Sequence, residues 1–301
     1  MKNITHRKFL FLMVLGLFTV LLCASCNKKI QESSKQKNIV AVSIVPEASF
    51  VKKICGADFD VITLIPPGYN PSSYELGPQE KRHLSKAKIC FTIGVPAEER
   101  ILKSLSPAIK RVSLDHIVAK EYPQRFINEH MSLNEKANAK GLRDPHIWLS
   151  PKRVQVMVSA IAENLINLNP SNAKKYKDNA DAYISELQKL ERDIVHILSP
   201  VKNKSFIVFH PSFGYFADDF GLHMYALENE GHDASPQTLI KLIDFAKKNG
   251  IKTIFYQDEI HSVQSRAFAE EIGGIAVPLY PLAADYSENL RKMAHLIKDS
   301  Q

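Results

Sequence analysis

The 301-residue chain contains 45% hydrophobic and 24% charged residues and has a formal net charge of +7. This length is sufficient for one large domain or two modest domains. Lys and Arg form no long block and no stretch interleaved with aromatic residues, which argues against a nucleic-acid partner.

The N-terminus has the pattern of an export signal. Lys2, Arg7 and Lys8 precede an apolar run, and residues 1–25 contain no acidic residue. The apolar run covers residues 9–23, which is short for a membrane span. Removal of residues 1–25 would lower the formal net charge from +7 to +4, because three basic residues would be lost.

Small residues lead into Cys26, and the polar stretch 27–38 follows it. This order resembles a bacterial lipoprotein signal, in which the cysteine is lipidated and becomes the new N-terminus. Cys23 stands where such signals usually have leucine, so a plain secretory signal cleaved near Ala24 is the alternative. Both interpretations predict an exported protein. The first predicts a lipoprotein that faces the periplasm or the cell exterior, with residues 26–37 as a tether.

Cysteine content after the signal is low. Cys55 and Cys90 are the two cysteines beyond Cys26, so the chain has no disulfide framework. Two buried thiols are favoured over a single bridge, although their pairing does not follow from the sequence.

Short β-branched runs alternate with amphipathic segments in residues 39–113, and the same alternation returns in residues 205–298. Such alternation predicts parallel sheets with helical crossovers. In the second region, Ser235 is a natural helix N-cap, Pro236 suits the first turn and Gly250 suits the end. We therefore predict an α/β fold with two lobes, each a mainly parallel sheet flanked by helices.

A helical stretch lies between these regions, and its second part begins at Pro170. Apolar residues recur there at spacings of three and four: Tyr176, Ala180, Tyr183, Leu187, Leu190, Ile194 and Ile197. A helix of roughly 28 residues would be about 40 Å long and would act as a rigid brace that resists wide hinge closure. The predicted limits are 38–168 for the N-terminal lobe, 169–199 for the connecting helix and 200–301 for the C-terminal lobe.

Two histidines occupy positions that suit a ligand site. His146 lies in "DPHIWLSP", just before a predicted helix start at Pro151, and His210 follows the apolar run 206–209. The carboxyl ends of parallel strands are where open α/β sheets bind ligands. Neutral imidazole suits zinc, copper, nickel and iron. One such histidine on each lobe predicts a metal site between the lobes, although their separation along the chain is by itself a weak signal.

The sequence also contains "GHDASPQTL" at residues 231–239 and a run from His210 to Leu222 that ends in "FGYFADDFGL". With "DPHIWLSP", the lipoprotein start and the two joined lobes, these features resemble the zinc/manganese solute-binding proteins of ABC importers over residues 38–300. The resemblance implies a lipid-anchored protein, expected to be a monomer, that captures zinc, manganese or iron. The resemblance also implies that the protein delivers the metal to a membrane permease and performs no catalytic step.

The resemblance further implies four ligand side chains: three histidines, or two histidines and a carboxylate, completed by a further carboxylate. His146 and His210 match the second and third positions. Ser72 replaces the first histidine in "PSSYE", and Tyr280 replaces the last carboxylate before "PL". A serine hydroxyl stays protonated, and a phenol binds zinc mainly when the metal removes its proton.

The predicted site is therefore atypical and consists of His146 and His210 with Ser72 and Tyr280, while Glu75 is a neighbouring carboxylate that could substitute. Gln257, Asp258 and Glu259 end a strand that is expected to face the same cleft. The sequence leaves two other functions open. A non-transport binding protein on the same scaffold could have lost tight metal binding. A metal hydrolase would need a general base beside a metal-bound water, and no His-Glu-x-x-His motif is present.

Overall fold

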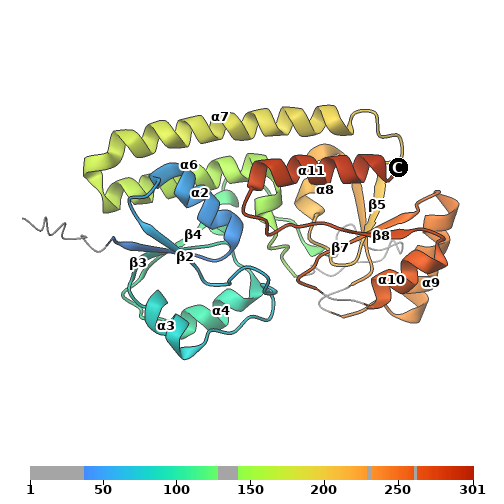
Figure 1. Ribbon diagram of the computed structural model, residues 1–301, viewed down its shortest axis with the longest axis horizontal. Coiled ribbons are helices and arrows are strands. Elements are labelled where there is room, and N and C mark those ends of the chain that lie inside the picture. The colour runs from blue at the N-terminus through green and yellow to red at the C-terminus, as the bar shows by residue number, and fades with distance from the viewer. Residues whose placement is uncertain (1–36, 128–141, 229–231, 261–262) are drawn as a thin grey trace, which may run out of the picture. The chain divides into compact units, whose positions relative to one another are not determined.

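The computed structural model describes residues 37–127, 142–228, 232–260 and 263–301. Residues 38–301 form one compact unit. The signal sequence and Cys26 lie outside the described residues, so their assignment stays a prediction. The compact unit contains two α/β lobes, as the alternation of strands and helices predicted (Figure 1).

The N-terminal lobe contains a four-stranded parallel sheet in the order β2-β1-β3-β4. Its elements are β1 (Ile39–Val42), α2 (Val45–Cys55), β2 (Asp60–Thr63), α3 (Pro78–Leu84), β3 (Ala87–Thr92), α4 (Pro96–Lys103), β4 (Lys110–Ser113) and α5 (Leu114–Val118). The periodicity predicted neither β4 nor α5 as a separate element. β4 is a four-residue edge strand with one buried side chain, so it has almost no apolar pattern.

The C-terminal lobe repeats this arrangement with the strand order β6-β5-β7-β8, again all parallel. Its elements are β5 (Ser205–Val208), α8 (Gly214–Phe220), β6 (His223–Ala226), α9 (Pro236–Lys248), β7 (Thr253–Tyr256), α10 (Val263–Glu271), β8 (Ile275–Pro278) and α11 (Tyr286–Asp299). The predicted cap of α9 is confirmed, since the Ser235 hydroxyl accepts a hydrogen bond from the Thr238 amide.

In each sheet the first strand lies between the second and third strands of its lobe. The crossover connections therefore leave in opposite directions at the carboxyl ends of the two middle strands, β1 and β3 in one lobe and β5 and β7 in the other. Ligands of open α/β sheets bind at such switch points, because loops diverge there and leave a crevice.

Two helices that form a hairpin join the lobes, α6 (Pro151–Leu168) and α7 (Ala173–Leu198), with the short helices η2 (Ile147–Leu149) and η3 (Pro170–Asn172) before each. α7 packs against α6 and α2 and also against α11 of the C-terminal lobe, so this long helix extends along both lobes (Figure 1). The predicted apolar stripe of α7 is buried from Tyr176 to Ile194. At its end, Leu198 is the buried residue in place of the predicted Ile197. The exact lobe boundaries stay predictions.

The lobes share one continuous hydrophobic core. Phe50 on α2 packs edge-on against Tyr286 on α11, with ring centroids 5.0 Å apart. The Tyr286 hydroxyl donates a hydrogen bond of 2.7 Å to the carbonyl of Trp148. A smaller core under α9 and α10 belongs to the C-terminal lobe alone. Because side chains of both lobes interlock under α7, wide opening of the lobes would expose apolar surface.

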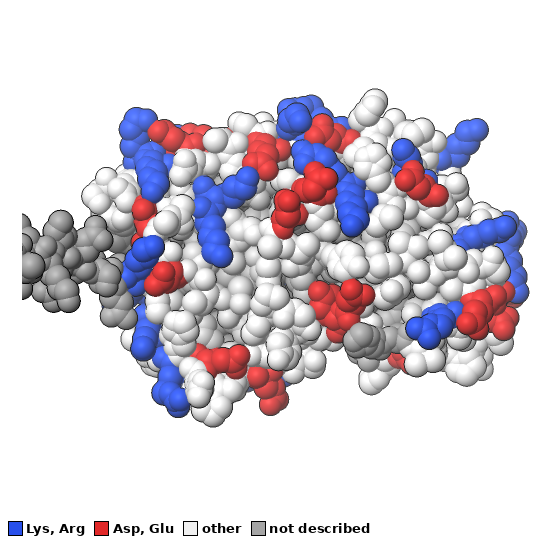
Figure 2. Space-filling view, in the orientation of Figure 1, with Lys and Arg blue, Asp and Glu red and all other residues white. Residues whose placement is uncertain are grey.

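Cys55 and Cys90 are buried free thiols in the N-terminal lobe, and burial raises the pKa of both. On the face seen in Figure 2, lysines and arginines are dispersed among acidic side chains. Within the described ranges, no helix has both the length and the apolar character needed to cross a membrane.

Candidate metal site

A small pocket lies where the switch points of the two sheets meet. It has room for one water-sized sphere, with a volume of about 20 Å³. Its lining comes from loops of both lobes and consists of Asn70, Pro71, Ser72, Val95, Pro96, Pro145, His146, Trp148, His210, Gln257, Ile260, Pro281 and Leu282. A cavity of this size suits a single ion and excludes a larger organic solute in this arrangement.

His146 is buried and is oriented by the aspartate two residues before it. The Asp144 Oδ1 atom accepts hydrogen bonds from the His146 backbone amide at 2.9 Å and from its Nδ1 atom at 2.8 Å. A carboxylate can only accept here, so the proton lies on Nδ1 and the lone pair lies on Nε2. Burial lowers the pKa of His146, against the opposing effect of Asp144, and this favours the neutral imidazole that binds metal.

His210 has the same arrangement with a carboxylate from a different strand end. It follows β5, and its Nδ1 atom lies 2.8 Å from Glu228 Oε2, just after β6. Glu228 is itself buried. The neighbouring strands β5 and β6 bring this pair together, because their carboxyl ends lie at the same edge of the sheet.

The two imidazoles lie against each other, with ring centroids 5.3 Å apart and an interplanar angle of 76°. Each has a carboxylate at Nδ1, which leaves Nε2 for a ligand. Metal-binding histidines in proteins commonly have this arrangement, since the carboxylate fixes the ring and increases its basicity. Around the pair, the described residues contain no cluster of three or more His, Cys, Asp or Glu side chains able to hold a metal ion. The described part of the chain therefore supplies two strong donors, where a closed zinc site has four.

Ser72 lines the same pocket, in a turn ordered by its own neighbours. The Asn70 side-chain oxygen accepts a hydrogen bond of 2.8 Å from the Ser72 amide. The Pro71 carbonyl accepts from the Ala97 amide at 3.1 Å, which joins this turn to the start of α4. The sequence-based placement of this loop at the cleft thus agrees with the pocket lining.

Glu75 and Tyr280 lie elsewhere. The side chain of Glu75 is 81% exposed and lies 3.9 Å from the Arg100 guanidinium. Tyr280 is 36% exposed, and its ring faces the Lys292 ammonium group. Its pKa is raised by desolvation and by Asp258, which disfavours the phenolate that would bind a metal. Neither side chain belongs to the pocket lining, although Pro281 and Leu282 beside Tyr280 do.

Gln257 reaches the pocket from the carboxyl end of β7, as the sequence suggested for the 257–259 segment. Its side-chain amide donates a hydrogen bond to the Ser212 hydroxyl, two residues after His210. The amide oxygen is the atom of Gln257 that can bind a cation. Gln257 is a neutral and weaker donor than the carboxylate expected at the fourth position.

Sequence reasoning missed both orienting carboxylates, Asp144 and Glu228. Asp144 could have been found, because "DPH" places a carboxylate two residues before a candidate ligand. Glu228 carries no such signal, since it is 18 residues after His210 and approaches it only through strand pairing.

Two buried glutamates hold the loops that follow β1 and β3. Glu47 Oε2 accepts from the amides of Ser43 and Ile44, at 2.9 and 3.1 Å. Glu98 accepts from the amides of Ile93 and Gly94, just before the pocket residues Val95 and Pro96. Desolvation and then the charge of Glu98 raise the pKa of Glu47 well above its usual value, and its Oε1 atom has no hydrogen-bond partner in the described part of the chain.

This burial predicts that the free energy of unfolding decreases as the pH rises. The pKa of Glu47 is higher in the folded than in the unfolded chain, so its stabilising contribution is complete below about pH 4.5 and is lost as the pH rises through the folded-state pKa. Glu47→Gln keeps the acceptor and removes the charge. We expect this variant to melt at a higher temperature than the unmodified protein at pH 7.5, with the difference disappearing near pH 4.5. Thermal melts across this range test it, and a constant difference would contradict it.

Comparison with known proteins identifies the family of this chain. The model of the family described as zinc-uptake complex component A periplasmic matches residues 40–300. The chain belongs to this family. One relative of this chain is the zinc-binding protein AdcA of Streptococcus pyogenes serotype M1. The two are 28% identical over 286 residues, which cover 90% of this chain and 55% of AdcA. The chain therefore spans about half the length of AdcA.

The high-affinity zinc uptake system protein ZnuA of Bacillus subtilis (strain 168) is 27% identical over 276 residues, which cover 86% of this chain and 85% of that protein. A crystal structure of a ZnuA deletion mutant with zinc bound is 35% identical and has a TM-score of 0.79, covering 88% of this chain and 98% of that chain. The chain thus shares its two-lobed fold with this zinc-bound ZnuA structure.

Proposed function

We propose that this protein is the solute-binding component of an ABC importer and captures a divalent transition metal, with zinc as the leading candidate. The supporting observation is the pair of imidazoles of His146 and His210, each with a buried carboxylate at Nδ1 and each with Nε2 free for a ligand. The names of AdcA and ZnuA, and the zinc in a related structure, support the same metal. The metal is cargo, so the protein performs no chemistry on it.

In this proposal, the Nε2 atoms of His146 and His210 are the two strong ligands. The Ser72 hydroxyl, the Gln257 amide oxygen or water would complete the coordination, because neutral oxygen donors of the lining are able to bind a cation. Manganese and iron remain candidates, since carbonyl, hydroxyl and water oxygens suit harder cations than zinc.

Metal titration tests this function. Protein purified without chelators is titrated calorimetrically with zinc, manganese and ferrous iron under anaerobic conditions. We expect one zinc ion per chain at micromolar concentrations or below, with weaker binding of manganese. Lack of binding by all three metals at about 100 µM would contradict the proposal, since this is already weak for a transition-metal receptor.

This chain lacks two of the metal ligands that are expected in the family. Their absence from the sequence supports a second candidate, a non-transport binding protein that has lost tight metal binding. Serine at position 72 and a neutral glutamine in the pocket leave two strong donors. The same titration separates the candidates, because this second function predicts no binding at micromolar metal while the fold remains intact.

We also propose that the exported protein is anchored by a lipid on Cys26 and delivers its metal to a membrane permease. The small residues before Cys26 and the polar stretch after it support the lipid. In a bacterium that processes lipoproteins, Cys26→Ser is expected to move the protein from the membrane fraction to the soluble fraction or the medium. Cys55→Ser serves as the control, because this thiol is buried in the N-terminal lobe. Equal membrane association of both variants would contradict the anchor.

A further inference from the structure

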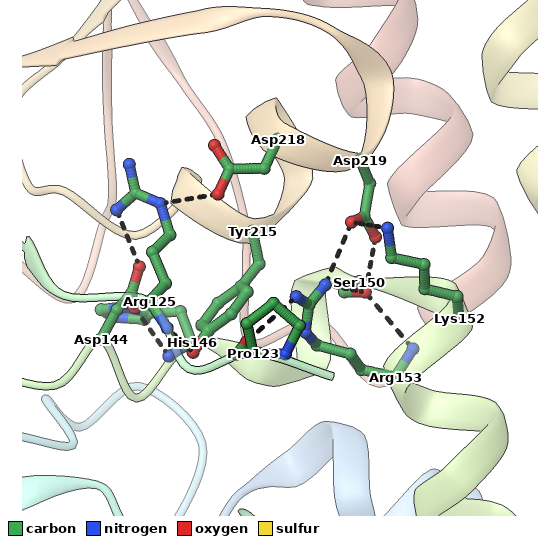
Figure 3. A network of polar contacts seen from close by, with 10 residues as sticks. All are labelled: Pro123, Arg125, Asp144, His146, Ser150, Lys152, Arg153, Tyr215, Asp218 and Asp219. Atoms are coloured by element: carbon green, nitrogen blue, oxygen red, sulfur yellow. Dashed lines mark hydrogen bonds and ion pairs between the residues drawn. The ribbon is translucent and has the colours of Figure 1, made fainter. Parts of the chain in front are cut away.

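Two buried arginines connect the segment around His146 to one helix of the C-terminal lobe (Figure 3). The Arg125 Nε atom donates a hydrogen bond of 3.1 Å to Asp218 on α8. The Arg153 Nη1 atom donates a hydrogen bond of 3.0 Å to Asp219, the next residue of the same helix. Both arginines are 5% exposed or less. The Asp219 side chain is buried as well, whereas the Asp218 side chain is 44% exposed.

The two arginines differ in their second contact. Arg125 Nη1 lies 3.3 Å from Asp144 Oδ2, while the other oxygen of this carboxylate accepts from His146. Arg153 Nη1 instead donates to the Ser150 hydroxyl, at the start of α6. A continuous chain of charged hydrogen bonds therefore runs from His146 through Asp144 and Arg125 to α8, whereas the Arg153 contacts do not include the histidine.

The backbone and a glycine hold Arg125 in place. Its amide donates to the Tyr215 hydroxyl at 2.9 Å, and its carbonyl accepts from the Asp144 amide at 2.8 Å. Gly214, the first residue of α8, lies directly against the guanidinium group. A Cβ atom at this glycine would be 2.3 Å from Arg125 Nη1, so any larger residue would displace the side chain.

From these contacts we infer that Arg125 is a positioning residue of the metal site. It holds the Asp144 carboxylate so that His146 presents Nε2 to the pocket, and it ties this orientation to α8 of the other lobe. The planar guanidinium can donate to both carboxylates at once from different nitrogens, which a single ammonium group does less well. The inference rests on the proposed function, because it concerns the same metal site.

Zinc affinity of matched arginine variants tests this role. Groups that orient a metal ligand typically change affinity by about 10-fold to 100-fold when removed. We expect Arg125→Met to lose affinity in this range and Arg125→Lys to recover part of it. Arg153→Met is the control, since it removes an equally buried arginine that also pairs with α8, and its affinity is expected to stay within about threefold. Equal losses in Arg125→Met and Arg153→Met would overturn the inference.

Gly214→Ala provides a test that removes no charge and remains informative if Arg125→Met does not fold. Gly214 begins a helix, where alanine is favourable, so the added methyl group should act mainly by displacing Arg125. We expect a loss of zinc affinity of about tenfold with a circular dichroism spectrum like that of the unmodified protein. Unchanged affinity would contradict the role of Arg125.

A readout without metal separates this inference from the proposed function. Nitrogen NMR of ¹⁵N-histidine-labelled, metal-free protein reports the tautomer of His146, which is assigned with His146→Gln. We expect one Nδ1-protonated tautomer in the unmodified protein and Arg153→Met, and a tautomer mixture in Arg125→Met and Gly214→Ala. If the unmodified protein fails to bind zinc but this difference is found, the function is wrong and the positioning role stands. Identical tautomers in all four proteins would refute the positioning role.

Discussion

Replacing His146 and His210 together by alanine is expected to abolish the rise in melting temperature that zinc produces. A ligand that binds only the folded protein at about 100 times its Kd stabilises it by about 2.7 kcal/mol, which corresponds to about 5–10 °C for a domain of this size. The two imidazoles are the strong donors of the pocket, and the remaining lining offers neutral oxygens and apolar groups. Differential scanning calorimetry with and without zinc measures the effect.

A matched double variant, His196→Ala with His223→Ala, controls for general loss of histidines. Both side chains are exposed, and neither lines the pocket. Zinc should therefore raise the melting temperature of this variant as much as that of the unmodified protein. A zinc response that survives removal of His146 and His210 would show that the metal binds elsewhere.

Ser72→His is expected to increase zinc affinity by about tenfold or more. Ser72 lines the pocket with His146 and His210, so an imidazole there would add a third strong donor to a site that has two. Each tenfold gain corresponds to about 1.4 kcal/mol of binding free energy. Competition with a chromophoric zinc chelator measures the change in affinity directly.

Ser73→His is the appropriate control, because it is the adjacent exposed serine and lies outside the pocket lining. It adds the same imidazole to the same turn, and its zinc affinity should equal that of the unmodified protein. If Ser72→His gains no more than Ser73→His, the turn does not place residue 72 within reach of the metal. In that case the serine at position 72 would not be the reason why the site has only two strong donors.

Much of the fold could be predicted because its signals are local. The period-two and period-three-to-four apolar patterns predicted two parallel α/β lobes and the long helix, and both are confirmed. Capping chemistry located the start of α9 at Pro236, and the predicted start of α6 at Pro151 is confirmed as well. β4 was not predicted, because an exposed edge strand of four residues has almost no apolar periodicity.

Some of the candidate ligands predicted from the sequence line the pocket, and others do not. His146 and His210 could be recognised from strand ends and sequence motifs, and they line one pocket. Tyr280 was assigned from the family resemblance, as the residue before "PL", and Glu75 was chosen because it neighbours a ligand position; both side chains lie outside that pocket. One residue along a loop changes the direction of a side chain, so sequence adjacency to a ligand position does not place a donor in the site.

The sequence by itself determined the two-lobed architecture, the family resemblance and the two histidines, because periodicity and short motifs are properties of adjacent residues. Only the tertiary structure decided how those histidines are oriented. Glu228 reaches His210 through parallel strand pairing, Arg125 reaches Asp144 within the N-terminal lobe, and Arg125 reaches Asp218 through contact between the lobes. These pairs are 18 to 93 residues apart along the chain, and such long-range contacts arise from packing of the whole fold, which leaves no mark in a local pattern.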